Sequence, residues 1–292
     1  MIIESGQVAV VTGAAQGLGR ALTAGLIDRG VSVVLADIAA ERLHSTAEEF
    51  TARSARVLPV ITDVSDAAAV NMLASRTLEH FGRIDVVVNN AGVASRASRP
   101  LWQTDPQDWH RILGVNLLGV VHGIQAFVPH LVTAGAGHVL NIASLAGLST
   151  IPFGGIYCAS KHAVVAISET LHHELKATGL PIRVTVACPA LVRTPMAEGL
   201  LTLAEADDDV LTAHLPAHLS LEQLRASVKR MIANLMEPDV AAERILAAVE
   251  TDRLYALTHG DFEDHARHRV EGILAALDDQ GWYEDHGRDS ER

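Results

Sequence analysis

The sequence is poor in cysteine, in aromatic residues and in basic charge, and each shortage narrows what the protein can be. Its two cysteines, Cys158 and Cys188, are too few for a disulfide framework, which favours an intracellular, cytoplasmic protein. Aromatic residues make up only 4% of the chain, so the core has to be built from aliphatic side chains. The net charge of −12 makes nucleic acids and anionic membranes unfavourable partners.

Recognisable targeting, membrane and metal signals are also missing. The segment from Met1 to Gly6 has no basic start followed by an apolar run, as a signal peptide would. No stretch reaches the roughly 18 uncharged apolar residues of a membrane span. The 15 histidines form neither an H-E-x-x-H motif nor a Cys/His ligand spacing, so we predict no metal site and no membrane partner.

What the sequence does contain is a regular alternation of two kinds of segment. From Gln7 to about Pro189, short runs rich in Val, Ile and Leu alternate with longer amphipathic stretches. This alternation predicts a parallel sheet with helices on both faces, a Rossmann-like doubly wound α/β fold. The strands are predicted at Val8–Thr12, Val31–Asp37, Arg56–Thr62, Ile84–Asn89, His138–Ser144 and Arg183–Ala187. The helices are predicted at Leu18–Arg29, Ala39–Arg53, Ala67–Phe81, Pro106–Val132 and Tyr157–Ala177.

The last third of the chain has a different pattern of predicted elements. Residues 194–237 read as mostly helical, and a helix, a strand and a helix follow at Val240–Thr251, Leu254–Thr258 and Phe262–Leu277. Because no linker rich in Pro, Gly or Ser appears, residues 1–292 are predicted to form one domain. Within it, residues 196–237 are expected to be a substrate lid and residues 278–292 a frayed tail.

Several residues mark helix ends. Asp105 can cap a helix with Pro106 in its first position, and Thr104 and Gln107 have capping-box spacing. Gly30 and Gly179 stand where C-terminal glycines belong. Two further helix starts are expected at Ser220, which has Gln223 three residues on, and at Pro238.

A glycine-rich turn follows the first predicted strand. The segment from Thr12 to Gly19 reads T-G-A-A-Q-G-L-G and leads directly into a helix. Its glycines allow a tight turn and a close approach to a pyrophosphate, and the helix N-terminus offers free N–H groups. The G-x-x-x-G-x-G spacing departs from the G-x-G-x-x-G dinucleotide fingerprint, but the order of strand, turn and helix is the required one.

Asp37 ends the second predicted strand, eighteen residues after Gly19. A carboxylate there can accept hydrogen bonds from ribose hydroxyls, and it repels a 2′-phosphate. Neither Gln16 nor Ile38 offers a cation for such a phosphate, so the sequence favours NAD over NADP. The competing interpretation is that Asp37 only caps the next helix.

Tyr157 and Lys161 are four residues apart on a predicted helix and therefore share a face. A nearby ammonium stabilises a phenolate and lowers the pKa of the tyrosine, which could then exchange a proton with an alcohol. A snorkelling lysine on an ordinary amphipathic helix is the competing interpretation. Ser144 ends the fifth strand thirteen residues before Tyr157, where its hydroxyl could bond a substrate oxygen.

Together these motifs resemble those of the short-chain dehydrogenase/reductase family over roughly residues 6–195. The resemblance lies in the T-G-x-x-x-G-x-G turn, the string N-N-A-G at residues 89–92 and the string Y-C-A-S-K at residues 157–161. It implies hydride transfer, a seven-stranded sheet and a homo-oligomer, either a dimer or a tetramer. It also implies a catalytic tetrad of Asn116, Ser144, Tyr157 and Lys161, in which Asn116 helps to hold a relay water.

The resemblance also implies which residues bind the cofactor. Asp63 and the Val64 backbone would reach the adenine, and Asn90 would steady the sheet. The complete set of expected cofactor-binding residues is Gly13, Gln16, Gly17, Leu18, Gly19, Asp37, Asp63, Val64, Asn90, Ala91, Gly92, Tyr157, Lys161, Pro189, Val192 and Thr194. Ala190 stands where the family usually has glycine, so the turn after Pro189 is expected to differ slightly.

The sequence thus predicts an oxidoreductase that transfers a hydride between NAD and a secondary alcohol or ketone. The apolar content of residues 196–237 favours a fairly large, hydrophobic small-molecule substrate. Two alternatives stay open: an NADPH-dependent ketone reductase, and a nucleotide-binding regulator without catalysis.

Overall fold

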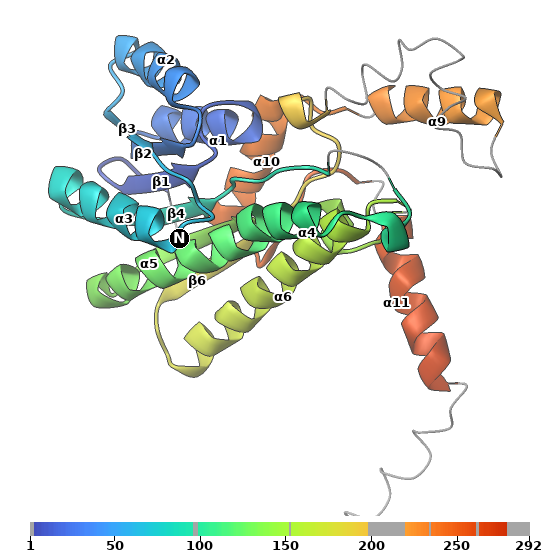
Figure 1. The fold of residues 1–292 in the computed structure, drawn as a ribbon. Helices are drawn as coiled ribbons and strands as arrows, with labels where there is room; N and C mark the ends of the chain where they lie inside the picture. The colour runs from blue at the N-terminus through green and yellow to red at the C-terminus, as the bar shows by residue number, and fades with distance from the viewer. Residues whose placement is uncertain are drawn as a thin grey trace, which may run out of the picture.

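A seven-stranded parallel sheet in the order β3-β2-β1-β4-β5-β6-β7 forms the centre of the computed structural model (Figure 1). The structure describes residues 3–95, 99–151, 153–197, 220–233, 235–260 and 263–278. The strands are β1 Val8–Thr12, β2 Ser32–Asp37, β3 Val57–Ile61, β4 Val86–Asn89, β5 Gly137–Ile142, β6 Ile182–Cys188 and β7 Tyr255–Leu257. The predicted doubly wound α/β fold is therefore confirmed, with each strand end within two residues of its prediction.

Helices cover both faces of the sheet, as Figure 1 shows. One face packs against α1 Gly17–Asp28, α2 Ala40–Ala52 and α10 Pro238–Glu250 in one aliphatic core. The other face packs against α3 Ala67–Phe81, α5 Gly119–Ala134 and α6 Gly155–Ala177 in a second core. The inner strands β2, β1, β4, β5 and β6 consist of four to seven mostly aliphatic residues, which suits burial because helices cover both faces of the sheet.

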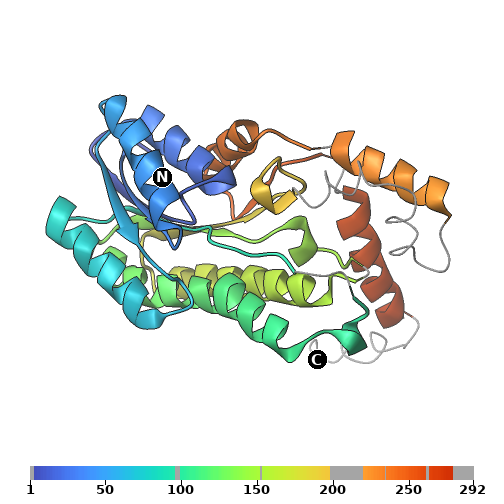
Figure 2. The ribbon, with the colours of Figure 1, turned by 45° about the horizontal axis from the view of Figure 1, so that its top comes forward.

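The remaining helical segments lie in the loops and after β6. They are η1 Leu101–Gln103, α4 Pro106–Leu113, the π-turn η2 Gly114–Leu118, η3 Leu145–Gly147, η4 Pro195–Ala197, α9 Leu221–Ala233 and α11 Glu263–Asp278. Figure 2 shows α9 and α11 at one end of the molecule, beyond the helices that cover the sheet. Of the predicted lid, only η4 and the segment around α9 are described. The acidic turn at residues 207–209 and the predicted tail beyond residue 278 lie outside the described residues.

The helix ends confirm most of the sequence signals. Gly30 and Gly179 adopt left-handed φ angles of +79° and +69°, and Pro238 opens α10. The amide of Gln223 donates to the Ser220 hydroxyl at 3.2 Å, and the Ser220 amide donates to Gln223 Oε1 at 2.7 Å, so that capping box is present.

The capping box predicted at Thr104 is wrong. Asp105 is the N-cap residue of α4, and its carboxylate accepts a hydrogen bond from the Gln107 amide at 2.8 Å. Thr104 lies one position before the cap, so its hydroxyl donates instead to Leu101 O at 2.8 Å. The same hydroxyl accepts from the Trp109 indole N–H at 2.9 Å.

The long helix predicted at Pro106–Val132 is not one regular α-helix. A π-turn, η2, interrupts it between α4 and α5. The combined segment Pro106–Ala134 is also long and apolar enough to cross a membrane, with a mean hydropathy of 1.6. It is the one helix of this length and hydropathy among the described residues. Core helices of globular proteins can be equally long and apolar. Because α5 packs on β4, β5 and α3, this segment belongs to the core of the fold.

Candidate functional site

The first glycine turn lies in direct contact with the end of β4. Gly13 has a left-handed φ of +66°, and a Cβ atom there would lie 2.9 Å from the Cα atom of Ala91. A Cβ atom on Gly19 would lie 2.1 Å from Gly13 O. No side chain can be added at either position without moving backbone, so the turn is a cradle of bare main chain.

Two side chains join this turn to β4. Asn90 Nδ2 donates to Thr12 O at 2.7 Å and to Gly13 O at 3.2 Å. The Thr12 hydroxyl accepts from the amides of Asn90 at 3.0 Å and Ala91 at 3.1 Å. This agrees with the steadying role expected of Asn90. Thr12 was missed as a site residue, although its place before Gly13, at the end of a strand, was a usable signal.

The N-terminus of α1 is suited to a pyrophosphate. Its N-cap residue, Gln16, forms no side-chain capping bond, and the first turn contains no acidic residue. The amides there are therefore left without a side-chain cap, at the positive end of the helix dipole. The Thr194 side chain contacts this turn, because a Cβ atom on Gly17 would lie 3.1 Å from Thr194 Cγ2. This bare backbone, uncapped helix start and covering threonine fit a dinucleotide.

Asp37 binds backbone on both sides of the expected ribose position. Its Oδ2 accepts from the Ala15 amide at 3.1 Å, and its Oδ1 accepts from the Ala39 amide at 2.9 Å. The carboxylate therefore links the glycine turn to the start of α2, which is more than a helix cap. Arg42 adds a charge that the sequence analysis had overlooked, since its guanidinium donates to Gln16 Oε1 at the edge of this region.

The segment after β3 is held by its own side chains. Asp63 Oδ1 accepts from the Ser65 amide at 2.9 Å and from the Ser65 hydroxyl at 2.7 Å. Val64 is buried, and its carbonyl accepts from His122 Nδ1 at 2.9 Å. One carboxylate oxygen of Asp63 is thus committed to a local turn, and contact with an adenine stays a prediction.

Ser144, Tyr157 and Lys161 converge at the carboxyl ends of β5 and β6. Lys161 Nζ donates to Ile142 O at 2.9 Å and lies 5.8 Å from the centroid of the Tyr157 ring. The Ser144 side chain hydrogen-bonds the Tyr157 phenol, and its hydroxyl also lies 3.4 Å from Pro189 O. The three side chains predicted from two separate segments therefore meet in one place.

Burial governs the charge state of this group. It raises the pKa of Tyr157 above its ordinary value, and the hydrogen bond with Ser144 opposes that rise. It also lowers the pKa of Lys161 to about 8, against a smaller opposing influence from Cys188 at the end of β6. The net lowering of the Tyr157 pKa expected from the sequence is therefore not found in the protein alone. An additional positive charge beside the phenol is needed to favour its phenolate.

Asn116 stands in the π-turn and is fully buried. Its Oδ1 accepts from the Val93 amide at 2.8 Å, and its Nδ2 donates to Val93 O at 3.0 Å and to the Ser160 hydroxyl at 3.2 Å. Ser160 belongs to the Y-C-A-S-K string, but it was not among the site residues predicted from the sequence. The side-chain amide of Asn116 joins the loop after β4 to α6.

The segment after β6 returns to the glycine turn. Pro189 O accepts from the Leu145 amide at 2.8 Å, and Val192 forms an isolated parallel bridge with Met236. Ala190 is not among the described residues with positive φ, so alanine replaces the family glycine there without left-handed strain. Pro189, Val192 and Thr194 therefore run from the Ser144 side of the site to Gly17.

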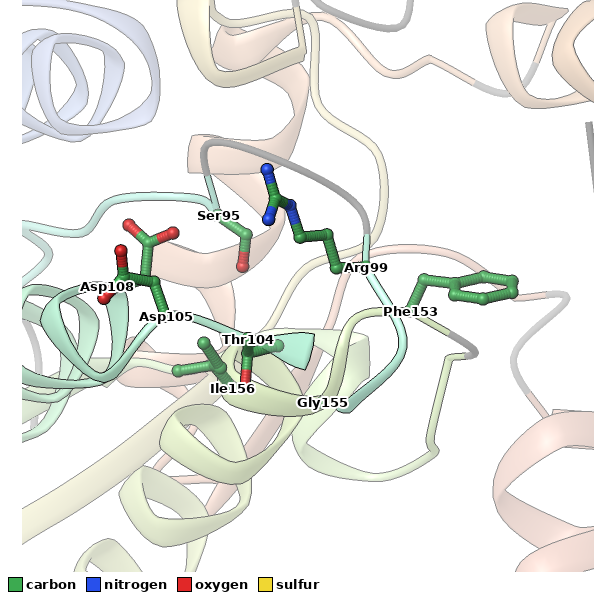
Figure 3. Close-up of a pocket in the computed structure, with 8 residues that line it drawn as sticks. All are labelled: Ser95, Arg99, Thr104, Asp105, Asp108, Phe153, Gly155 and Ile156. Carbon is green, nitrogen blue, oxygen red and sulfur yellow. The ribbon is translucent and has the colours of Figure 1, made fainter. Parts of the chain in front are cut away.

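A cavity of about 160 Å³ opens at the start of α6 (Figure 3). Its described lining residues are Ser95, Arg99, Thr104, Asp105, Asp108, Phe153, Gly155 and Ile156. Figure 3 shows Asp105 and Asp108 together at the start of α4, with Arg99 on the facing loop. The described wall of this cavity is therefore mixed polar and apolar. Most of residues 196–237, the segment expected to form an apolar lid, lies outside the described residues.

Comparisons with known proteins agree with this geometry. A family model described as short chain dehydrogenase matches residues 7–203. The chain is 36% identical over 254 residues to 1-deoxy-11-beta-hydroxypentalenate dehydrogenase of Streptomyces avermitilis, covering 87% of this chain and 84% of that protein. It is 37% identical over 212 residues to 2-(R)-hydroxypropyl-CoM dehydrogenase of Xanthobacter autotrophicus, covering 72% of this chain and 84% of that protein.

A solved structure has the same fold. A short chain dehydrogenase/reductase from Burkholderia phymatum in complex with NAD superposes with a TM-score of 0.81 at 36% sequence identity. The match covers 94% of this chain and 97% of that chain. The fold and the site define a nicotinamide-dependent oxidoreductase of the doubly wound class. The chain belongs to the short-chain dehydrogenase/reductase family, whose members act on small molecules.

Proposed function

We propose that this protein interconverts a secondary alcohol and its ketone with NAD as the preferred cofactor. The observation that carries the proposal is the meeting of Ser144, Tyr157 and Lys161 beside an uncapped helix N-terminus and a bare glycine turn. The relatives named above are dehydrogenases, and the Burkholderia phymatum structure contains NAD. Both facts support this reaction class.

The expected residues fit the cofactor in three groups. Gly13, Gly17 and Gly19, with the Gln16 and Leu18 backbone, would hold the pyrophosphate at the start of α1. Asp37 would bind the adenosine ribose, and Asp63 with Val64 would face the adenine. The nicotinamide side would be bordered by Asn90, Ala91, Gly92, Tyr157, Lys161, Pro189, Val192 and Thr194. When bound there, NAD supplies the hydride acceptor and a positively charged ring.

The protein's own residues transfer the proton and stabilise the charges that develop. In oxidation, the Tyr157 phenolate accepts the hydroxyl proton of the alcohol, and in reduction the phenol returns it to the carbonyl oxygen. The Ser144 hydroxyl donates to the same oxygen and stabilises charge that develops there. The Lys161 ammonium, held on Ile142 O, stabilises the phenolate through its charge. Asn116 acts through Ser160 to keep the helix carrying Tyr157 in place.

The substrate is proposed to be fairly large, with both apolar and polar surface. Phe153 and Ile156 offer apolar contacts in the cavity at the start of α6, and Ser95, Thr104 and Arg99 offer polar ones. Substrates named in the relatives' descriptions, a hydroxypentalenate and a hydroxypropyl-CoM, combine a secondary alcohol with a larger body. We propose a substrate of this general kind, without assigning either compound.

The reaction is tested by following NAD and NADP reduction over a panel of secondary alcohols that includes steroids, terpenols and aryl carbinols. Cofactor binding is measured in parallel by fluorescence titration. We expect turnover with at least one alcohol and a higher kcat/KM with NAD. Tight dinucleotide binding without turnover on any alcohol or ketone would instead identify a nucleotide-binding regulator.

A further inference from the structure

A ladder of buried polar side chains runs beneath the candidate site. Asn89 Nδ2 donates to Asn141 Oδ1 at 2.8 Å, and Asn141 Nδ2 donates to the Ser168 hydroxyl at 2.9 Å. That hydroxyl donates in turn to Val164 O at 2.6 Å. Asn141 and Ser168 are fully buried. Because a buried polar group is costly without its partner, this ladder strongly favours one arrangement of β4, β5 and α6.

The ladder lies two helical turns from the proposed catalytic lysine. Ser168 follows Lys161 by seven residues, so both side chains lie on the face of α6 that meets the sheet. Lys161 Nζ bonds Ile142 O, and Ser168 bonds the side chain of the preceding residue, Asn141. Helix α6 is thus tied to two consecutive residues of β5.

The other helix of the site meets the same ladder. A Cβ atom on Gly123 of α5 would lie 2.0 Å from Asn89 Oδ1, so the α5 backbone rests directly on the Asn89 side chain. Gly123 follows Asn116 by seven residues, just as Ser168 follows Lys161. Asn89 and Asn141 are also register partners in β4 and β5. One pair of adjacent asparagines therefore contacts α6, which carries Tyr157 and Lys161, and α5, which continues from the segment η2 that carries Asn116.

We propose that the hydrogen bond between Asn141 and Ser168 is a positioning device, which sets the register of α6 on β5 and holds the Lys161 ammonium at a fixed distance from the Tyr157 ring. The effect expected on kcat rests on the proposed function, whereas the effect expected on the position of Lys161 does not. Neither residue contacts the reacting atoms, so both act through Lys161. Apart from Tyr157, the titratable group that faces Lys161 is Cys188 on β6, whose thiol burial keeps neutral by raising its pKa to about 12.

The test compares Ser168→Ala with Ser168→Thr, which retains a hydroxyl. Thr77→Ala is the matched control, because Thr77 is a fully buried helical hydroxyl that donates to Leu73 O at 2.8 Å in α3, away from the site. The Tyr157 pKa is read with NAD bound, because a further positive charge beside the phenol is needed to bring its ionisation into the range where Lys161 is charged. It is taken from the ultraviolet absorbance of the phenolate, as the difference between each protein and the same protein carrying Tyr157→Phe. The pH dependence of kcat is measured with an aryl carbinol.

We expect Ser168→Ala to raise the Tyr157 pKa by about one unit, because a displaced ammonium stabilises the phenolate less. The kcat should fall roughly tenfold, which corresponds to one pKa unit of lost stabilisation, while KM stays within about twofold. Ser168→Thr should restore both values. Thr77→Ala should lower only the thermal midpoint.

Equal losses of stability in Ser168→Ala and Thr77→Ala, with an unchanged Tyr157 pKa in both, would overturn the inference and leave Ser168 a purely structural residue. If Ser168→Ala does not fold, Ser168→Cys keeps the volume with a weaker hydrogen-bond acceptor and enters the same comparison. The absorbance titration needs no turnover. A shifted Tyr157 pKa in a protein that oxidises no alcohol therefore supports this inference while counting against the proposed function.

Discussion

The side-chain amide of Asn116 donates a hydrogen bond to the hydroxyl of Ser160 at 3.2 Å and so joins the π-turn η2 to α6. Ser160 then donates to Tyr157 O at 2.8 Å. Since the Asn116 side chain also makes two hydrogen bonds to Val93, all its hydrogen-bonding groups have protein partners. The role of Asn116 in holding a relay water, which the family resemblance implies, stays a prediction.

Replacing Asn116 by leucine should destabilise the protein. The substitution leaves the Val93 amide and carbonyl without their partners, and it removes the donor to Ser160. We expect the free energy of unfolding in urea to fall by about 2 kcal/mol or more. Asn71→Leu, at an exposed position of α3, is the control and should stay within about 0.5 kcal/mol of the unsubstituted protein. Equal effects at the two positions would contradict the packing role of Asn116.

Cofactor preference should depend on Asp37 and Arg42 in opposite ways. Asp37→Asn removes the charge that opposes a 2′-phosphate, so the ratio of kcat/KM for NAD over NADP should drop about tenfold, or about 1.4 kcal/mol. Arg42→Ala should lower kcat/KM with NADP and leave NAD within about twofold. Arg53→Ala, at the far end of α2 and paired with Asp28, is the control for a lost surface charge. An unchanged ratio in Asp37→Asn would refute the ribose assignment.

The glycine cradle can be tested with two glycines that share a left-handed backbone. Gly13 and Gly179 have φ angles of +66° and +69°, but only Gly13 has neighbours within reach of a Cβ atom. Both Gly13→Ala and Gly179→Ala should lose about 1 kcal/mol of stability from backbone strain, and Gly13→Ala should lose more because its Cβ atom meets the Ala91 backbone. Only Gly13→Ala should weaken NAD binding, by about tenfold or more in a fluorescence titration. Equal affinities in the two variants would show that the contact with Ala91 is unimportant.

The alternation of apolar runs and amphipathic stretches predicted the first six strands and most of the helices that cover them, and a short apolar run at Leu254–Thr258 predicted the seventh. Other features depend on register and packing. The contact between Asn89 and Asn141 exists because β4 and β5 pair in one register, which no local spacing encodes. The π-turn at Asn116 breaks no hydrophobic period, so it was predicted as plain helix. Lys161 lies near Cys188 only because α6 packs over β6, so the spacing of these residues in the sequence does not reveal the contact.

His138 should make stability depend on pH. It is fully buried in β5 and bonds the Thr185 hydroxyl, and burial lowers its pKa to about 3. Between pH 6.5 and 3 the unfolded chain binds a proton that the folded chain excludes, so stability is lost as pH falls through this window. Moving from pH 6.5 to 5 should cost about 2 kcal/mol from this residue, at about 1.4 kcal/mol per pH unit.

Urea denaturation at the two pH values checks this expectation. His138→Gln, which does not titrate, should remove most of that loss, and His173→Gln at an exposed position should not. A pH dependence that is the same in both variants and in the unsubstituted protein would assign the loss to other groups.

The most direct test of the account is single-turnover hydride transfer in Tyr157→Phe, measured beside the unsubstituted protein at saturating NAD and with an alcohol that the unsubstituted protein oxidises. Fluorescence titration first establishes that the variant binds NAD normally. The account predicts a fall in rate of about 10²-fold to 10⁴-fold, because the phenol that exchanges the proton is gone. A variant that binds NAD, folds normally and transfers hydride at close to the original rate would contradict it.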